Sequence, residues 1–326
     1  MNAAAHLSWS AEALWRMLEP HLPGISVEVL ARVESTNTLL LERARSGAGR
    51  RDAPITTPGE LEALRQRGVP TEPAALDSAG VVRRGRRSDD TQPCLLVAEH
   101  QTLGRGRQGR AWVSAPGASL TFSLSLPLAP ADWSGLSLAV GVALADAIEP
   151  PDPALGAPRL LLKWPNDLWL RDDAVTVGGR KLGGVLIETV AVGGRRMVVV
   201  GVGLNIAPLS APPPGVTLTH GYASLQELDP QASAPQVLHR IALPIVRALR
   251  QFEREGFAGF AGAYERRDVL RGRRISALDA ARSETTLDGV AEGVARSGAL
   301  RLRGDDGTLH EISTGEVGVR VGDVTR

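Results

Sequence analysis

Apolar positions along the chain follow strand and helix periods in alternating blocks, which indicates a domain that mixes the two elements. Alternating or continuous apolar runs of strand length predict strands at residues 25–33, 94–100, 119–128 and 159–170. Two more β-rich runs lie within 181–206, and the pair "GG" that joins them is a hairpin signal. Helical spacing predicts helices at residues 9–20, 36–47, 134–150 and 233–257.

Local signals refine several of these elements. Ser134 stands in the position of an N-cap, and Pro150 follows the end of the same helix. Pro244 predicts an interruption of the last helix, because proline lacks the N–H that a helix interior needs. Pro165 cannot donate to a sheet ladder, so the strand that contains it must end or bulge there. Residues 207–217 are rich in proline and are interpreted as a loop.

Residues 47–93 differ from the rest of the chain. They are rich in Gly, Pro, Arg and Asp, and only 59–68 has the spacing of a short helix. A connection of this length is usually a functional lid or disordered. The shortage of apolar residues favours a poorly ordered insertion, and its charge run "RRGRRSDD" is interpreted as a solvated surface.

The C-terminal part of the chain has a different pattern. Short strands alternate with Gly/Asp turns, which is typical of a small β-barrel. We therefore expect two domains, at residues 1–267 and 268–326, with the boundary near Arg267.

Composition narrows the class of protein. Among 326 residues, Lys and Arg number 37 and Asp and Glu 36, so the chain lacks the basic excess of most nucleic-acid-binding domains. The single cysteine, Cys94, permits no disulfide within the chain, which fits a reducing cytoplasm. The N-terminus does not resemble a signal peptide, and no apolar run approaches the about 18 residues of a membrane span. We expect a cytoplasmic protein with no membrane contact.

The stretch "GRGRQGRAW" (104–112) concentrates positive charge in a short loop. Arg105, Arg107 and Arg110 alternate with glycines, which let backbone N–H groups converge on an anion, while arginine binds phosphate oxygens through paired donors. Trp112 is the one aromatic residue of the stretch, whereas extended single-strand binders usually offer several. A small phosphate ligand therefore fits better than a nucleic acid. The alternative is a solvated basic turn.

Four weaker motifs accompany this loop. In "KWPND" the proline directs Asn166 and Asp167 out of the sheet, although an Asn-Asp turn is also common. In "GRKLGG" the glycines around Lys181 allow a ligand to approach the backbone, or they mark an ordinary hairpin. The motif "GVGLN" (201–205) ends an apolar strand. The motif "ESTN" (34–37) stands at a strand-to-helix junction, where its side chains either cap the helix or hold an uncharged polar ligand.

The order of "ESTN", "GRGRQGRAW", "KWPND", "KLGG" and "GVGLN" closely resembles that of bacterial biotin–protein ligases, over roughly residues 25–320. The resemblance implies an α/β catalytic domain, with a mixed sheet packed by helices, followed by a small SH3-like barrel. It implies that the carboxylate of biotin attacks the α-phosphate of ATP, with Mg²⁺ accompanying the nucleotide, to give biotinyl-AMP. A lysine of a carrier domain then attacks this anhydride. The usual target is the biotin carboxyl carrier protein of acetyl-CoA carboxylase.

The resemblance also assigns roles to individual residues. It makes Lys181, Arg107 and Asp167 the catalytic residues, with Lys181 between the biotin carboxylate and the α-phosphate. It places biotin against Ser35, Thr36, Asn37, Gln101, Gly104, Arg105, Arg107, Lys181, Gly201 and Gly203. It places the nucleotide against Arg107, Arg110, Trp112, Asn166, Lys181, Asn205 and Tyr222. Asn166 and Asp167 would lie near Mg²⁺ and the phosphates, and no separate metal-ligand set is expected.

The chain departs from the family pattern in several places. Only about 25 residues precede the catalytic motifs, too few for the winged-helix domain of bifunctional members, so we expect a ligase that neither binds DNA nor represses. The insertion at 47–93 is unusual, and Gln108 replaces an arginine of some relatives. Relatives often dimerise through the catalytic sheet, so a homodimer is an open possibility.

Two alternatives stay open. A lipoate or octanoate ligase shares the fold, although a polar "ESTN" with Gln101 favours the ureido group of biotin over an aliphatic chain. A nucleic-acid-binding regulator would use the arginine loop instead, against the near-neutral net charge.

Overall fold

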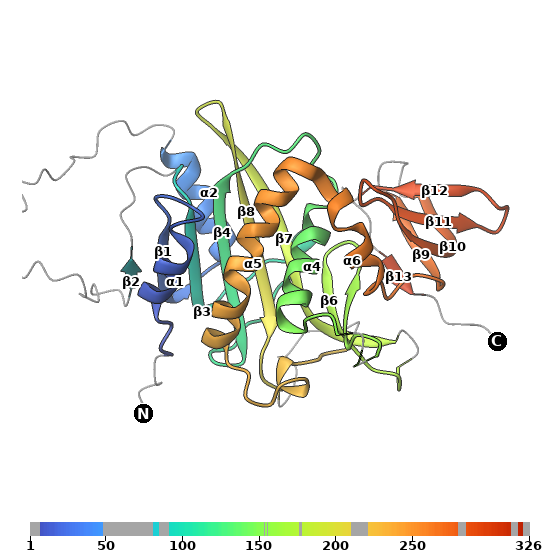
Figure 1. Cartoon of the computed structure of the whole chain (residues 1–326), viewed down its shortest axis with the longest axis horizontal. Helices are drawn as coiled ribbons and strands as arrows, with labels where there is room; N and C mark the ends of the chain where they lie inside the picture. Colours follow the sequence, from blue (N-terminus) through green and yellow to red (C-terminus); the bar gives the residue numbers. More distant parts are fainter. Residues whose placement is uncertain are drawn as a thin grey trace, which may run out of the picture.

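The computed structural model describes residues 7–47, 81–84, 91–152, 154, 156–175, 178–209, 221–279, 285–313 and 319–321. Two sheets organise the described residues: an eight-stranded mixed sheet with helices, and a five-stranded antiparallel sheet near the C-terminus (Figure 1). The α/β class and the mixed sheet expected from the sequence are confirmed. None of the described helices is both long and apolar enough to span a membrane.

The larger sheet has the strand order β2-β1-β3-β4-β8-β7-β6-β5. Only β1 and β3 pair in parallel, and every other neighbouring pair in this sheet is antiparallel. Its strands are β1 (Ser26–Val33), β2 (Val81–Arg84), β3 (Cys94–Gln101), β4 (Ser119–Pro127), β5 (Leu160–Lys163), β6 (Asp167–Arg171), β7 (Gly179–Val192) and β8 (Arg195–Asn205).

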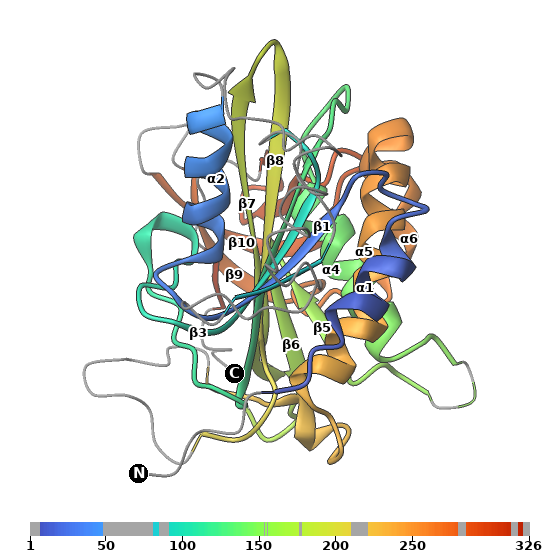
Figure 2. The same cartoon turned by 90° about the vertical axis from the view of Figure 1, so that its left-hand side faces the viewer.

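Helices cover both faces of this sheet. Figure 2 shows α2 on one side of the sheet and α1, α4, α5 and α6 on the other. The α-helices are α1 (Ala11–Leu18), α2 (Thr36–Gly47), α4 (Leu136–Ile148), α5 (Ala234–Glu255) and α6 (Ala261–Glu265). Short 3₁₀ segments are η1 (Arg107–Gly109), η3 (Leu225–Glu227) and η4 (Gly256–Gly259).

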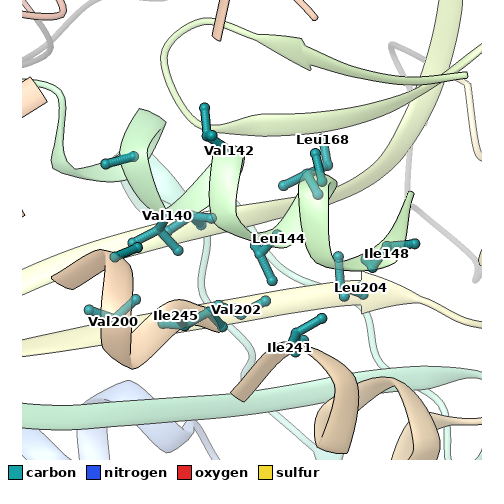
Figure 3. Packing of buried hydrophobic residues seen from close by; sticks show 14 of the residues in the cluster. Val140, Val142, Leu144, Ile148, Leu168, Val200, Val202, Leu204, Ile241 and Ile245 are labelled. Carbon is teal, nitrogen blue, oxygen red and sulfur yellow. The ribbon is translucent and has the colours of Figure 1, made fainter. Parts of the chain in front are cut away.

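Because both faces of the sheet are covered, β8 is buried on both sides, which explains its continuous apolar "MVVV" run. Val199 packs with Leu40 and Leu41 of α2 on one face. On the other face the side chains of β8 meet α4 and α5 (Figure 3). The residues of this second cluster that Figure 3 labels are Val140, Val142, Leu144, Ile148, Leu168, Val200, Val202, Leu204, Ile241 and Ile245.

Turns fall where the sequence predicts them. Gly193 and Gly194 connect β7 and β8 with φ values of 53° and 78°. Positive φ at both central residues is the requirement of a type I′ hairpin turn, which glycine meets without strain. The run at 159–170 is two strands rather than one: β5 ends at Lys163 and β6 begins at Asp167, so Pro165 ends a strand as expected.

Two predictions, one at a helix end and one inside a helix, were wrong. Ser134 is not the N-cap of α4, because Gly135 occupies that position with φ of 80°. The helix α5 continues through Pro244 without interruption. A proline inside a helix costs about 3 kcal/mol, because it removes one backbone hydrogen bond and its ring clashes with the preceding turn. Burial of Ile241 and Ile245 on either side outweighs this cost.

The insertion contributes a strand that the sequence did not reveal. Strand β2, at Val81–Arg84, pairs antiparallel with β1 and extends the sheet at that edge. Most of 47–93, including the helix expected at 59–68, lies outside the described residues, as do positions 210–220.

The smaller sheet has the order β12-β11-β10-β9-β13, antiparallel throughout, as expected for an SH3-like domain. It contacts the larger domain where the Trp164 Nε1–H donates to the carbonyl oxygen of Gly298 at 3.0 Å. The boundary near Arg267 stays a prediction. Its strands are β9 (Arg274–Asp279), β10 (Thr285–Val294), β11 (Leu300–Gly304), β12 (Leu309–Ile312) and β13 (Val319–Val321).

Candidate functional site

An ion pair lies at the junction of β6 and β7. Lys181 Nζ is 2.8 Å from Asp167 Oδ1, and both side chains are partly buried. The antiparallel register places Asp167 opposite Gly184, and a Cβ on Gly184 would lie 3.3 Å from that carboxylate oxygen. Glycine at this position therefore leaves the carboxylate accessible to Lys181 and to a ligand.

Lys163, the first residue of "KWPND", also belongs to this site, although the sequence alone assigned it no role. It pairs with Asp167 across the β5–β6 hairpin and is only 4% exposed, with Nζ 5.3 Å from the centre of the Trp169 ring. Burial lowers its pKa to about 8, opposed by Asp167 and reinforced by Lys181 and Arg110.

A sequence signal for Lys163 exists. Of the 37 lysines and arginines in the chain only two are lysines, Lys163 and Lys181, and both stand at this site. An ammonium group is a compact point charge, whereas guanidinium is a broad planar fork. In a chain that uses arginine for every other cation, the two lysines mark positions where the compact group is suited to the space.

The arginine loop contributes to the same electrostatic cluster. Burial lowers the pKa of Arg107, with Asp167 raising it and Arg110 lowering it again, so all three charges lie within interaction range. Arg107, Arg110, Lys163 and Lys181 thus place four cations around the carboxylate of Asp167. Such an excess of fixed positive charge attracts a polyanion.

The loop itself is closed by backbone hydrogen bonds. The Trp112 N–H donates to the Gly104 carbonyl at 2.8 Å, and the Gly106 N–H donates to the Arg110 carbonyl at 2.7 Å. Gln108, which stands where some relatives have arginine, has the left-handed φ of 54°. A left-handed residue other than glycine costs about 1–2 kcal/mol, so the loop stores a small strain at its tip.

A second group of predicted residues forms a polar cluster beside β4. Ser35 caps α2, because its Oγ accepts from the Thr38 N–H at 3.4 Å. Thr36 uses its N–H to donate to Gln101 Oε1 at 2.8 Å. The residues of "ESTN" therefore have different roles. Ser35 caps the helix, whereas Thr36 and its neighbour Asn37 belong to the polar cluster.

Two residues of this cluster, Ser123 and Glu188, were not predicted from the sequence. Ser123 Oγ donates to Asn37 Oδ1 at 2.5 Å, and the Asn37 amide donates to Glu188 Oε2 at 3.0 Å. Glu188 also faces Arg105, whose Nη2 is 3.6 Å away. The serine was read as one of the alternating polar positions of β4, yet it is fully buried because α2 covers that face.

Glycines form the wall between the two groups. A Cβ on Gly201 would collide with Asn37 Oδ1, and one on Gly203 would lie 2.6 Å from Trp112 Cζ2. Gly104 is similarly closed off by the Trp112 carbonyl. The Trp112 Nε1 is buried and has no hydrogen-bond partner among the described residues. A buried N–H without a partner is costly and is often completed by a ligand.

On the far side of Lys181 lies the segment that contains Tyr222. The Ala223 N–H donates to the Lys181 carbonyl at 2.9 Å, and Asn205 Nδ2 donates to the Ala223 carbonyl at 3.0 Å. The Tyr222 hydroxyl donates to the Ala207 carbonyl at 2.8 Å. Burial, with a smaller effect of a nearby carboxylate, raises the pKa of Tyr222 to about 12, so the hydroxyl remains a donor at neutral pH.

Asn166 is joined to Val185 of β7 by two hydrogen bonds. Its Nδ2 donates to the Val185 carbonyl at 2.7 Å, and the Val185 N–H donates to the Asn166 carbonyl at 2.9 Å. These two bonds hold the "KWPND" turn against β7. The structure thus brings the predicted residues into two adjoining groups, one polar and one cationic, separated by the glycine wall.

Comparison with known protein families gives two matches. Residues 84–205 match the Biotin/lipoate A/B protein ligase family, and residues 272–320 match the Biotin protein ligase C terminal domain.

Several curated relatives are similar in sequence. The bifunctional ligase/repressor BirA of Escherichia coli is 33% identical over 227 residues, which cover 69% of this chain and 65% of that protein. BirA of Salmonella typhimurium is 31% identical over 248 residues, covering 75% and 70%. A biotin–acetyl-CoA-carboxylase ligase of Paracoccus denitrificans is 34% identical over 228 residues, covering 65% and 85%. The chain therefore spans about two thirds of the length of the BirA proteins it matches.

Among solved structures, the biotin protein ligase of Aquifex aeolicus in complex with biotin and ATP superimposes with a TM-score of 0.61. The match covers 91% of this chain and 99% of that one at 23% identity. The likeness shows that the two chains share a fold.

Proposed function

Because this chain belongs to the biotin protein ligase family, we propose that it activates biotin with ATP and transfers the biotinyl group to a carrier-domain lysine. The carrier is the biotin carboxyl carrier protein of acetyl-CoA carboxylase. The observation that carries the proposal is the cationic cluster around Asp167 and Lys181, which adjoins a polar, glycine-walled group of residues.

In the first step two anions must meet. A carboxylate oxygen of biotin forms a bond to the α-phosphorus of ATP, while the bond from that phosphorus to the leaving pyrophosphate breaks. Their mutual repulsion is offset by cations that are already in place, which act where charge develops in the transition state. Lys181 faces the carboxylate and the α-phosphate, and Arg107 and Lys163 face the charge that passes to pyrophosphate.

The polar cluster provides the biotin site. Thr36, Asn37 and Gln101 offer hydroxyl and amide groups to the ureido ring, and Ser123 holds Asn37 in position from behind. Gly201 and Gly203 keep the wall flat enough for the ring system, with Trp112 packed against it. A ligand of this kind requires uncharged donors and acceptors in a largely apolar surround.

Mg²⁺ enters with the nucleotide. This cation prefers oxygen ligands and is usually held by one or two carboxylates together with substrate phosphates. Asp167 fits as such a carboxylate. The described part of the chain holds no cluster of three or more acidic, histidine or cysteine side chains that could bind a metal.

In the second step the carrier lysine amine attacks the carbonyl carbon of biotinyl-AMP, and the bond from that carbon to the AMP oxygen breaks. The amine must lose a proton, and Asp167 is the acceptor at the site. Arg105 and Arg107 cover the anhydride until the amine arrives, which limits its hydrolysis.

The test is Lys181→Ala, assayed for acyl-adenylate by mass spectrometry after incubation with ATP and biotin, lipoate or octanoate. We expect biotin alone to be activated by the wild type, and Lys181→Ala to lose about a hundredfold or more in rate, as on removal of a donor to a developing anion. Arg254→Ala, an exposed arginine of α5, is the matched control and should keep full activity.

Two outcomes would replace the proposal. Activation of lipoate or octanoate without biotin would make the protein a ligase for those acids. Salt-dependent DNA binding without ATP–pyrophosphate exchange would make it a nucleic-acid-binding regulator.

A further inference from the structure

Arg180 joins two separate segments on the nucleotide side of the site to its own strand, β7. Its Nε donates to Asp172 Oδ2, its Nη2 to Glu227 Oε2 and its Nη1 to the Tyr222 carbonyl oxygen, each at 2.6 Å. Asp172 follows β6, while Tyr222 and Glu227 flank the start of η3. One guanidinium group thus ties the β6–β7 connection to the chain that carries the tyrosine.

The partners of Arg180 are themselves fixed. Glu227 Oε1 accepts from the Ser224 N–H at 2.8 Å and completes the capping box of η3. Burial alone would raise the pKa of Glu227, but hydrogen bonds from Arg180 and Ser224 hold that pKa below its usual value. The bond from Arg180 likewise holds the pKa of Asp172 below its usual value. All the charges of this cluster are therefore present at neutral pH.

The cluster is built around the arginine. Gly221 has φ of 63°, and a Cβ there would lie 2.9 Å from Arg180 Cγ. Only glycine both adopts this conformation without strain and leaves room for the arginine stem. The planar guanidinium group donates hydrogen bonds in three directions, which the ammonium group of a lysine cannot do with the same geometry.

Arg180 and Lys181 are adjacent on β7 and act on opposite sides of the same short segment. Ala223, between Tyr222 and Ser224, is bound by the Lys181 carbonyl and by Asn205. Tyr222 is held by Arg180 at its carbonyl and by Ala207 at its hydroxyl. The tyrosine ring is therefore fixed relative to the strand that presents the catalytic lysine.

We infer that Arg180 is a positioning residue for the nucleotide base: it holds Tyr222 at a set place beside Lys181, so that the adenine ring and the α-phosphate are bound in register. This inference rests on the proposed function. Arg180 touches neither reacting atom, and it acts through Tyr222 and Glu227. The binding of biotin and of pyrophosphate, which carry no base, does not depend on it.

The experiment compares Arg180→Ala, Arg180→Lys and Glu227→Gln with wild type. We expect Arg180→Ala to raise KM for ATP about tenfold or more, because it removes three charge-assisted hydrogen bonds. KM for biotin and inhibition by pyrophosphate should stay within about twofold of wild type, and inhibition by AMP should weaken along with ATP binding. Arg180→Lys and Glu227→Gln, which keep part of the cluster, should fall between.

The matched control is Arg303→Ala. Arg303 also donates twice to one carboxylate, Glu292, but lies on the small sheet. It should leave both KM values unchanged.

Equal losses for ATP, biotin and pyrophosphate would overturn the inference, because they would show general damage to the fold. Unchanged KM for ATP in both Arg180→Ala and Glu227→Gln would overturn it as well. A wild-type protein that forms no biotinyl-AMP would instead refute the proposed function itself.

Discussion

Replacing Lys163 by methionine should make the protein more stable and less active. The ammonium group is buried, and its pKa falls from 10.5 to about 8 mainly because burial disfavours its charged form. At about 1.36 kcal/mol per pKa unit, this difference corresponds to about 3 kcal/mol of lost stability at neutral pH. Methionine has a similar length and no charge, so it relieves this cost with little change in packing.

The size of the stability difference changes with pH in a defined window. Below pH 8 the lysine is protonated in both the folded and the unfolded chain, so the full cost is present. Between pH 8 and 10.5 the unfolded chain binds more protons than the folded chain, so the stability of the wild type rises with pH. Above that range both forms are neutral, and the advantage of Lys163→Met should disappear.

The assay is urea unfolding of both proteins at pH 7 and pH 9.5, followed by ATP–pyrophosphate exchange at pH 7. We expect the variant to be more stable by about 3 kcal/mol at pH 7, with a much smaller gap at pH 9.5. Exchange should be greatly reduced. A pH-independent gap, or a variant less stable than wild type at pH 7, would refute the claim that Lys163 is a strained buried cation. Because the chain has only two lysines, NMR of the methylated amines can report this pKa directly.

Two further changes test the wall of the site and the packing beneath it. Gly203→Ala should weaken biotin binding about ten- to hundredfold in titration calorimetry, because its methyl group overlaps the Trp112 ring and overpacking costs about 1–3 kcal/mol. Unchanged affinity would show that the glycine is not needed there. Arg267→Ala should destabilise the fold by about 3–5 kcal/mol in denaturant, because this 3% exposed arginine forms ion pairs with both Glu149 and Asp146. The exposed ion pair of Arg303 is the comparison, and its loss should leave the stability almost unchanged.

Local sequence determined most of the secondary structure and the identity of the motifs. Apolar period and length placed the strands β1, β3 and β4, and "GG" placed the β7–β8 turn, because these depend on neighbours a few residues apart. Pro165 was correctly expected to end a strand for the same reason. The order of five short motifs indicated the family, and the resemblance supplied the roles of residues such as Lys181.

Tertiary structure decided which side chains meet. Asn37 reaches Glu188 across 151 positions of sequence, and no local pattern marks either as a partner of the other. Ser123 stands in an alternating strand pattern, and it is buried because α2 covers that face of the sheet. Likewise, Pro244 breaks an isolated helix, yet burial of its neighbours keeps α5 intact.

The site itself shows the same division. The sequence names Lys163, Asp167 and Lys181, but only the antiparallel register of β5, β6 and β7 sets them side by side. Burial then lowers the pKa of Lys163, which no composition or motif can show, because desolvation depends on everything packed around a charge. Local chemistry thus determined the residue types present, and long-range packing determined their distances, exposure and charge state.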